Sequence, residues 1–164
     1  MSEKKFTFFW GGPFSQWDSS PFMALDGLMY NCAEQYMMAQ KAMLFKDQDT
    51  FKKIMATTDP KEQKTLGRQV KNFVPLIWDT YSTMVIYDGS IYKYSQNEKH
   101  RKTLLDTGDT ILVEASPYDA IWGIKMGVDN PSINDMNLWQ GENRLGFILT
   151  KVREVIKDEM AHTS

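Results

Sequence analysis

The segment from Asn31 to about Phe45 constrains the fold of this chain most. A helix that is apolar on all sides is buried in a protein core rather than laid on its surface. Asn31 has the side chain of a helix N-cap, and Glu34 at the third helical position would complete a capping box. The sequence therefore predicts a buried helix here. Its apolar positions cover most of the helical circumference: Ala33, Tyr36, Met37, Met38, Ala39, Ala42, Met43 and Leu44.

Two charged side chains lie on this predicted core helix. Glu34 and Lys41 are seven residues apart, or two helical turns, and so share one face. A charge on a buried helix is costly unless it is paired or faces a polar cavity. Two turns separate the pair by about 10 Å along the axis, so we expect other groups between or beside them. Capping alone remains an alternative for Glu34, and a snorkelling stem remains one for Lys41.

Shorter signals predict the remaining elements. Aromatic and β-branched residues indicate strands over 6–10 and 110–114, and Asp26-Gly27 indicates the turn of a hairpin over 21–30. The predicted class is α+β, mostly helical, with a few short strands. No linker divides the 164 residues, so we expect a single compact domain, 1–164, with a core over about 6–160. Caps and apolar spacing predict further helices over 47–55, from 59, over 75–94, over 97–106 and over about 145–160.

The composition excludes several kinds of site. One cysteine and two histidines leave no material for a disulfide framework or a Cys/His metal site, so we expect no metal and no cofactor. A net charge of −2 argues against a wide surface for long duplexes, but not against a local basic pocket. Aromatic residues make up 13% of the chain, which suits planar ligands such as bases, although a packed core uses the same residues. No apolar run is long enough for a signal peptide or a membrane span, so we expect a cytoplasmic protein.

A cluster of basic residues and two loop segments are further site candidates. Lys61, Lys64, Arg68 and Lys71 are spaced to share one helical face, which is either solvated or phosphate-binding. Asp119 and Trp122 follow the strand at 110–114, on a predicted short helical turn. Asp119 suits binding of ribose hydroxyls and Trp122 suits stacking on a planar ring. The alternative is that Asp119 is a local cap and Trp122 a core residue. The loop over 139–146 enters the last helix, whose N-terminus could face an anion.

Several of these stretches occur together in one known family. They stand here as Phe14-Ser-Gln-Trp17 with Pro21-Phe22, Asn31-Cys-Ala-Glu-Gln-Tyr-Met-Met-Ala-Gln-Lys41-Ala42, Gly67-Arg68, Trp78, Tyr94-Ser-Gln-Asn97, Leu104-Leu-Asp-Thr-Gly108, Glu114-Ala-Ser-Pro-Tyr-Asp-Ala-Ile-Trp-Gly123 and Gly141-Glu-Asn-Arg-Leu-Gly146. In order and spacing they resemble the NADAR family, also called YbiA-like proteins, from Phe14 to about Arg153. The resemblance implies a YbiA-like fold.

The resemblance also implies an N-glycosidase, a hydrolase that cleaves the bond between a nitrogen and C1 of a ribose. Some members act on phosphoribosylamino intermediates of riboflavin synthesis, and others remove ADP-ribose from guanine in nucleic acid. Many members have a histidine where this chain has Gln35, so a histidine role is not carried over. The residues implied are Glu34, Lys41 and Asp119 as catalytic, with Trp122, Trp78, Arg68, Trp17 and Asn143 as substrate-binding.

These residues suggest a mechanism as a hypothesis. Glu34 would stabilise the positive charge that develops at C1, or activate the water. Lys41, with a pKa lowered by burial, would attack C1 and hold the opened ribose as a Schiff base. We expect removal of ADP-ribose from guanine in nucleic acid. The alternatives are clearance of riboflavin-pathway ribosylamines, a non-catalytic binder of ADP-ribose or nucleotides, and a plain interaction domain.

Overall fold

The computed structural model describes residues 4–163. Their contacts divide the chain into two compact units, which are taken in turn. The first unit is 1–15 with 101–164, and the second is 16–100. Six α-helices and four short strands occur within the described residues, so the predicted class, α+β and mostly helical, is confirmed. The single-domain organisation stays a prediction.

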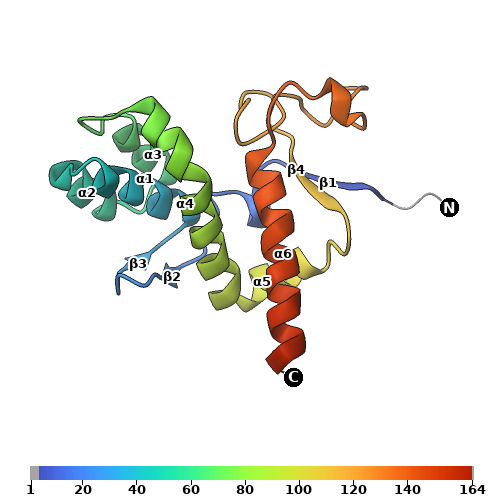
Figure 1. Cartoon of the computed structure of the whole chain (residues 1–164), viewed down its shortest axis with the longest axis horizontal. Coiled ribbons are helices and arrows are strands. Elements are labelled where there is room, and N and C mark those ends of the chain that lie inside the picture. Colours follow the sequence, from blue (N-terminus) through green and yellow to red (C-terminus); the bar gives the residue numbers. More distant parts are fainter. Residues whose placement is uncertain (1–3, 164) are drawn as a thin grey trace. The chain divides into compact units, whose positions relative to one another are not determined.

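The second unit is built around α1 (Ala33–Leu44), the helix that the sequence predicts to be buried. It packs against α2 (Gln48–Met55), α3 (Pro60–Gly67) and α4 (Pro75–Gln96), as Figure 1 shows. Neighbours on three sides explain why α1 is apolar nearly all round, since each side of the helix is removed from water by a different partner. The prediction of a buried central helix is confirmed.

The start of α1 differs from the prediction by one residue. Cys32, not Asn31, is the N-cap, so Glu34 lies at the second helical position and Gln35 at the third. The side chain of Gln35 accepts a hydrogen bond from the backbone N–H of Asn31, the residue before the N-cap, at 2.7 Å. The side chain of Asn31 is used elsewhere, because its Oδ1 accepts from Nε2 of Gln63 on α3. Glu34 is therefore not at the capping-box position of α1.

Two glycines let neighbouring helices approach α1 closely. A Cβ on Gly89 of α4 would lie 2.8 Å from Cδ2 of Tyr36, and a Cβ on Gly67 of α3 would overlap the Sδ of Met38. Gly89 weakens α4 as an isolated helix, but it permits this contact and the predicted helix is confirmed. The close approach at Gly67 also places the next residue, Arg68, beside α1.

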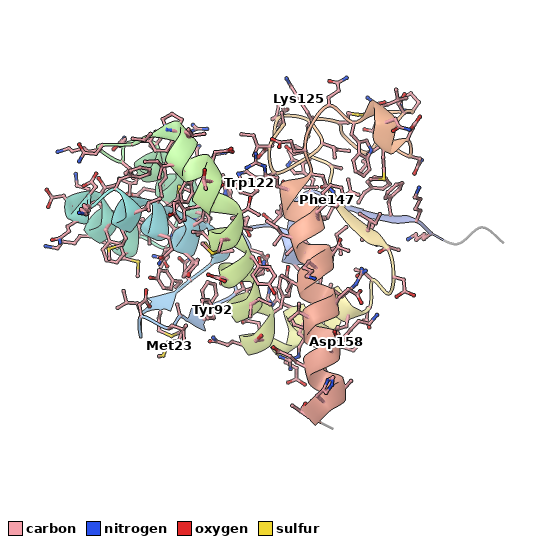
Figure 2. The ribbon with its side chains drawn as sticks, in the orientation of Figure 1. Met23, Tyr92, Trp122, Lys125, Phe147 and Asp158 are labelled. Atoms are coloured by element: carbon pink, nitrogen blue, oxygen red, sulfur yellow. The ribbon has the colours of Figure 1, made fainter. Side chains whose placement is uncertain are left out.

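A short hairpin completes the second unit. Strands β2 (Phe22–Met23) and β3 (Met29–Tyr30) are antiparallel, and the turn contains Gly27 at φ 80°, as Asp26-Gly27 predicts. The ring of Phe22 stacks on Tyr92 of α4 with ring centroids 5.9 Å apart; Figure 2 labels Tyr92 on α4 and Met23 on β2. Helix α5 (Glu98–Leu105) follows α4, and the division between the units falls within it.

The first unit joins the two ends of the chain through a pair of parallel strands. Strands β1 (Phe6–Phe9) and β4 (Ile111–Glu114) pair with Phe6 opposite Ile111, and α6 (Arg144–Thr163) packs against β4. Short 3-10 helices lie at Gly12–Phe14 and Met136–Leu138. The predicted strands and the C-terminal helix are confirmed.

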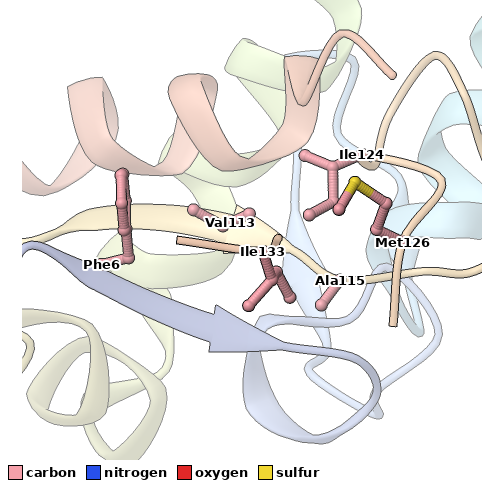
Figure 3. Close-up of a cluster of buried hydrophobic side chains, with 6 residues drawn as sticks. All are labelled: Phe6, Val113, Ala115, Ile124, Met126 and Ile133. Atoms are coloured by element: carbon pink, nitrogen blue, oxygen red, sulfur yellow. The ribbon is translucent and has the colours of Figure 1, made fainter. Parts of the chain in front are cut away.

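A buried apolar cluster forms the core of the first unit, and Figure 3 shows it. One residue of the cluster comes from β1 and one from β4, and the long segment after β4 supplies the rest. The cluster consists of Phe6, Val113, Ala115, Ile124, Met126 and Ile133.

No helix in residues 4–163 is both long and apolar enough to cross a bilayer.

Candidate functional site

One face of α1 carries the two predicted catalytic residues of the second unit. Glu34, Met38, Lys41 and Phe45 are spaced by four, three and four residues, which places them in a line along the helix. The charged residues are buried, with Glu34 6% and Lys41 8% exposed. Met38 lies between them and meets Gly67 at the end of α3. The line therefore faces the end of α3 and the segment that follows it.

The amine of Lys41 lies against aromatic rings from that segment. Its Nζ is 4.4 Å from the ring centroid of Phe73 and 5.9 Å from that of Trp78. Phe73 precedes α4 and Trp78 lies in its first turn. The faces of aromatic rings attract a cation, and this attraction strengthens where water is excluded. The sequence predicts other groups beside Lys41 without identifying them, and these two rings occupy that place.

Burial lowers the pKa of Lys41 below its usual value, and nearby charges modify this effect. The carboxylate of Glu34 raises the pKa of Lys41, and the guanidinium of Arg68 lowers it. The charges of Glu34 and Arg68 thus both act on the amine of Lys41. A lowered pKa increases the neutral fraction of the amine, which is the form that attacks an electrophilic carbon.

Arg68 and the basic cluster are arranged differently from the prediction. Helix α3 ends at Gly67 and Arg68 is its C-cap, so only Lys61 and Lys64 of the cluster lie on the helix. Lys71 follows in the connecting segment, so the four side chains do not share one helical face. The cause is the early end of α3, which basic spacing alone does not reveal. All four side chains are exposed.

Trp17 also lies in the second unit, in the segment before the hairpin. Its side chain is 43% exposed, and the Nζ of Lys64 lies 5.9 Å from its ring centroid. The preceding residue, Gln16, accepts a hydrogen bond through its carbonyl from the backbone N–H of Glu34 at 2.9 Å. This bond ties the Trp17 segment to the first turn of α1.

Asp119 and Trp122 lie in the first unit, in the segment after β4. Figure 2 labels Trp122. The predicted short helical turn is instead a turn closed by a side chain: Oδ1 of Asp119 accepts from the N–H of Ile121 at 2.9 Å and of Trp122 at 2.8 Å. The guanidinium of Arg144 lies 5.9 Å from the ring centroid of Trp122. Asp119 is thus a local cap, and its contact with a substrate stays a prediction.

Asn143 has a structural role in the first unit. It is fully buried; its Oδ1 accepts from the N–H of Glu114 and its Nδ2 donates to the carbonyl of Leu112, which ties it to β4. The expectation that the start of α6 faces an anion is wrong. The N–H groups of Asn143, Arg144 and Leu145 donate to the carbonyls of residues 121–123. Asn143 as a substrate contact remains untested.

The second unit therefore groups Glu34, Lys41, Arg68 and Trp78, and also contains Trp17. Asp119, Trp122 and Asn143 belong to the first unit. Within residues 4–163, no group of three or more His, Cys, Asp and Glu side chains is arranged to hold a metal ion.

Comparison with known proteins gives the family. Residues 3–157 match the NADAR domain. The chain belongs to the NADAR family. It is 43% identical to an N-glycosidase of Acanthamoeba polyphaga mimivirus, covering 94% of this chain and 98% of that protein. It is 41% identical to protein irg-1 of Caenorhabditis elegans, covering 77% of this chain and 61% of that protein.

The fold agrees with this membership. The NMR structure of YbiA from Escherichia coli matches with a TM-score of 0.79 and 26% identity, covering 98% of this chain and 90% of that one. In sequence, N-glycosidase YbiA is 28% identical over 90% of this chain and 83% of its own length. The NADAR resemblance and the YbiA-like fold are both confirmed. By family the chain is an N-glycosidase, a hydrolase that acts on N-glycosyl bonds.

Phe73 is the residue of this site that sequence reasoning missed. It contacts Lys41 through space although the two are 32 residues apart. Its only sequence signal is its place between the end of the basic cluster and Pro75, in a segment with no helical period.

Proposed function

We propose that this NADAR N-glycosidase hydrolyses the bond between a nitrogen and C1 of a ribose, and that its substrate is ADP-ribose attached to guanine in nucleic acid. The observation that supports the proposal most is the buried amine of Lys41. It lies two turns from Glu34 on one helix face, with Arg68 close enough to lower its pKa. A core helix gains no stability from such a group, so chemistry is the better reason for it.

In the proposed reaction Lys41 is the nucleophile. Its neutral amine attacks C1, and the bond from C1 to the base breaks as the base leaves with a proton. The ribose ring then opens to a Schiff base on Lys41, and water hydrolyses it to free the sugar and the amine. The lowered pKa supports this role because the neutral amine is more abundant near neutral pH.

Glu34 is the proposed partner of that amine. A carboxylate near C1 stabilises the positive charge that develops as the base departs, and it can also activate the water. Trp78 is proposed to stack on the base and Arg68 to hold phosphate. Asp119 is proposed to orient ribose hydroxyls, and Trp122 to stack on a ring, as their side-chain chemistry suits.

The surface around Lys41 favours a nucleic-acid substrate over a small metabolite. Phe73 and Trp17 are 40% and 43% exposed, and the basic side chains of Lys64, Arg68 and Lys71 are exposed in the same unit. Exposed rings with nearby cations suit stacked bases and a phosphate backbone. A net charge of −2 limits such binding to a local patch rather than a long duplex.

The test compares two substrates and two variants. Wild-type protein, Lys41→Ala and Glu34→Gln are incubated with an oligonucleotide that carries ADP-ribosylated guanine, and separately with a phosphoribosylaminopyrimidine. Mass spectrometry follows the release of sugar and base, and borohydride is added to trap a Schiff base. We expect release of ADP-ribose, an adduct on the peptide that contains Lys41, and loss of both in Lys41→Ala.

Other outcomes identify the alternatives. Release from the pyrimidine alone would assign the protein to clearance of riboflavin-pathway ribosylamines. Retained binding of ADP-ribose without turnover of either substrate would indicate a binding module. Full activity of Lys41→Ala with no trapped adduct would remove the Schiff-base step.

A further inference from the structure

Phe73 is held in place although much of its ring is exposed. The side chain is 40% exposed, so it adds little to a core. Its ring meets that of Phe45 at an interplanar angle of 75°, with centroids 5.4 Å apart, and it lies 4.4 Å from the Nζ of Lys41. Phe45 and Lys41 are one turn apart on the same face of α1. The ring thus spans the two residues at the end of that face.

Residues 69–74 form the segment that carries Phe73, and this segment is anchored at the residues that precede Phe73 in the sequence. Val70 is buried, and the backbone N–H of Lys71 donates to Oδ2 of Asp47 at 2.9 Å. Asn72 has φ 61°, in the left-handed region that asparagine tolerates better than most residues. Beyond the ring, Pro75 begins α4. These anchors fix where the ring can lie.

Asp47 joins this segment to the end of α1. Its Oδ1 accepts from the backbone N–H of Thr50, and its Oδ2 accepts from Oγ1 of Thr50 at 2.6 Å as well as from Lys71. The hydrogen bond from the Lys71 N–H, followed by those from Thr50, lowers the pKa of Asp47 to about 2. The anchor therefore stays ionised throughout the neutral range.

We propose that Phe73 is a positioning residue for Lys41, and that Asp47 anchors the segment that carries it; this rests on the proposed role of Lys41 as the nucleophile. The four-carbon stem of lysine has many rotamers, and an amine that attacks C1 must be held close to one position. The ring face holds the protonated amine close to one position without an acceptor atom, so the nitrogen is already in place when its proton is lost.

The first test needs no substrate. Full-length protein is methylated with formaldehyde and a borane reductant over a range of pH, and peptide mass spectrometry reports the extent at Lys41. Phe73→Leu keeps an apolar cover but removes the π face that stabilises the ammonium, so the pKa of Lys41 should fall by about one unit. Phe73→Tyr restores the ring and should restore the pKa. Tyr81→Leu, which removes an exposed ring from α4, should leave the pKa of Lys41 unchanged.

The second test uses turnover of the ADP-ribosylated oligonucleotide. Phe73→Leu should lower kcat about tenfold and leave KM within about twofold, because the ring acts through Lys41 rather than on substrate. Phe73→Tyr should recover kcat. An unchanged or raised pKa of Lys41 in Phe73→Leu would overturn the proposal, and so would a loss that is confined to KM.

A matched pair of variants tests the anchor. Asp47 caps α2 and Asp59 caps α3, each through a backbone hydrogen bond, but only Asp47 holds residues 69–74. Asp47→Ala and Asp59→Ala should both lower Tm, and only Asp47→Ala should reproduce the pKa and kcat changes of Phe73→Leu. Equal effects of the pair on kcat would contradict the anchor role. Because methylation needs no substrate, failure of Lys41→Ala to lose activity would reject the nucleophile and still leave the contact between ring and amine measurable.

Discussion

Replacing Lys41 by methionine should abolish turnover and leave the protein folded. Methionine is unbranched, has nearly the same helix propensity as lysine, and fills a similar volume along α1. The substitution removes an amine whose residue is 8% exposed, and with it the contact to Phe73 at 4.4 Å. The expected change in the free energy of unfolding is the sum of two terms, which are the loss of the contact with Phe73 and the removal of a buried charge.

The magnitude follows from that balance. Loss of the cation–π contact costs about 0.5 to 2 kcal/mol. Replacing a buried ion pair by apolar groups of similar volume is neutral or stabilising by about 1 to 4 kcal/mol in other proteins, and we take the same range for the removal of this buried charge. The two terms together place the free energy of unfolding of Lys41→Met between about 2 kcal/mol lower and about 3 kcal/mol higher. For a chain of this size, each kcal/mol raises Tm by about 2 to 4 °C.

The assay pairs thermal unfolding with turnover of the ADP-ribosylated oligonucleotide. Lys52→Met, an exposed position in the last turn of α2, serves as the control and should change neither measurement appreciably. A lower Tm for Lys41→Met, by more than about 8 °C, would give the amine a structural role. Retained turnover would refute its chemical role.

Four further predictions concern Glu34, Arg68, Asp119 and Gly146. Glu34→Gln should lower turnover by about 10² to 10⁴ and Tm by less than about 4 °C, since glutamine keeps the shape of the side chain and loses the charge that is proposed to be catalytic. The rise of kcat with pH that reports the neutral amine of Lys41 should move to lower pH in Glu34→Gln, because Glu34 raises that pKa, and to higher pH in Arg68→Gln, because Arg68 lowers it; a shift in the same direction in both variants would contradict one of the two signs. Asp119→Asn keeps the oxygen that caps the turn, so Tm should stay the same while activity falls. Unchanged activity would mean that Asp119 serves only as a local cap. Gly146→Ala should cost about 1 to 3 kcal/mol in chemical denaturation, because its Cβ would overlap the carbonyl of Leu112 in β4.

Elements with strong local signals were predictable from the sequence. The buried helix, the hairpin turn at Asp26-Gly27 and the cap of α2 at Asp47 each depend on residues within one or two turns of one another. The pairing of Glu34 with Lys41 on one face follows from the same periodicity. Propensity and spacing describe such features well because no distant partner decides them.

The parts that were not predictable depend on distant partners. Asn31 is a good N-cap by itself, but Gln63 of α3 takes its side chain and the helix starts one residue later. The basic cluster has helical spacing, but α3 ends at Gly67. Phe73 reaches Lys41 only because Asp47 holds the segment between α3 and α4. For Asn31 and for Phe73 a contact across tens of residues decides the outcome, and local spacing does not reveal such a contact.

Many of the residues that carry the family resemblance have architectural roles. Gln35 holds the backbone of Asn31 just before α1, Gly67 admits Met38, and Asn143 ties α6 to β4, so each would be needed even in a protein without activity. Lys41 is different, because methionine could fill its place in the core helix without burying a charge. The fold does not need the amine of Lys41, yet this amine is buried beside aromatic rings, and an anchored segment carries one of them. A reaction of the amine with a substrate is the best explanation for its presence. Motif membership alone therefore does not separate scaffold from chemistry, whereas the energetic cost of each side chain to the fold does.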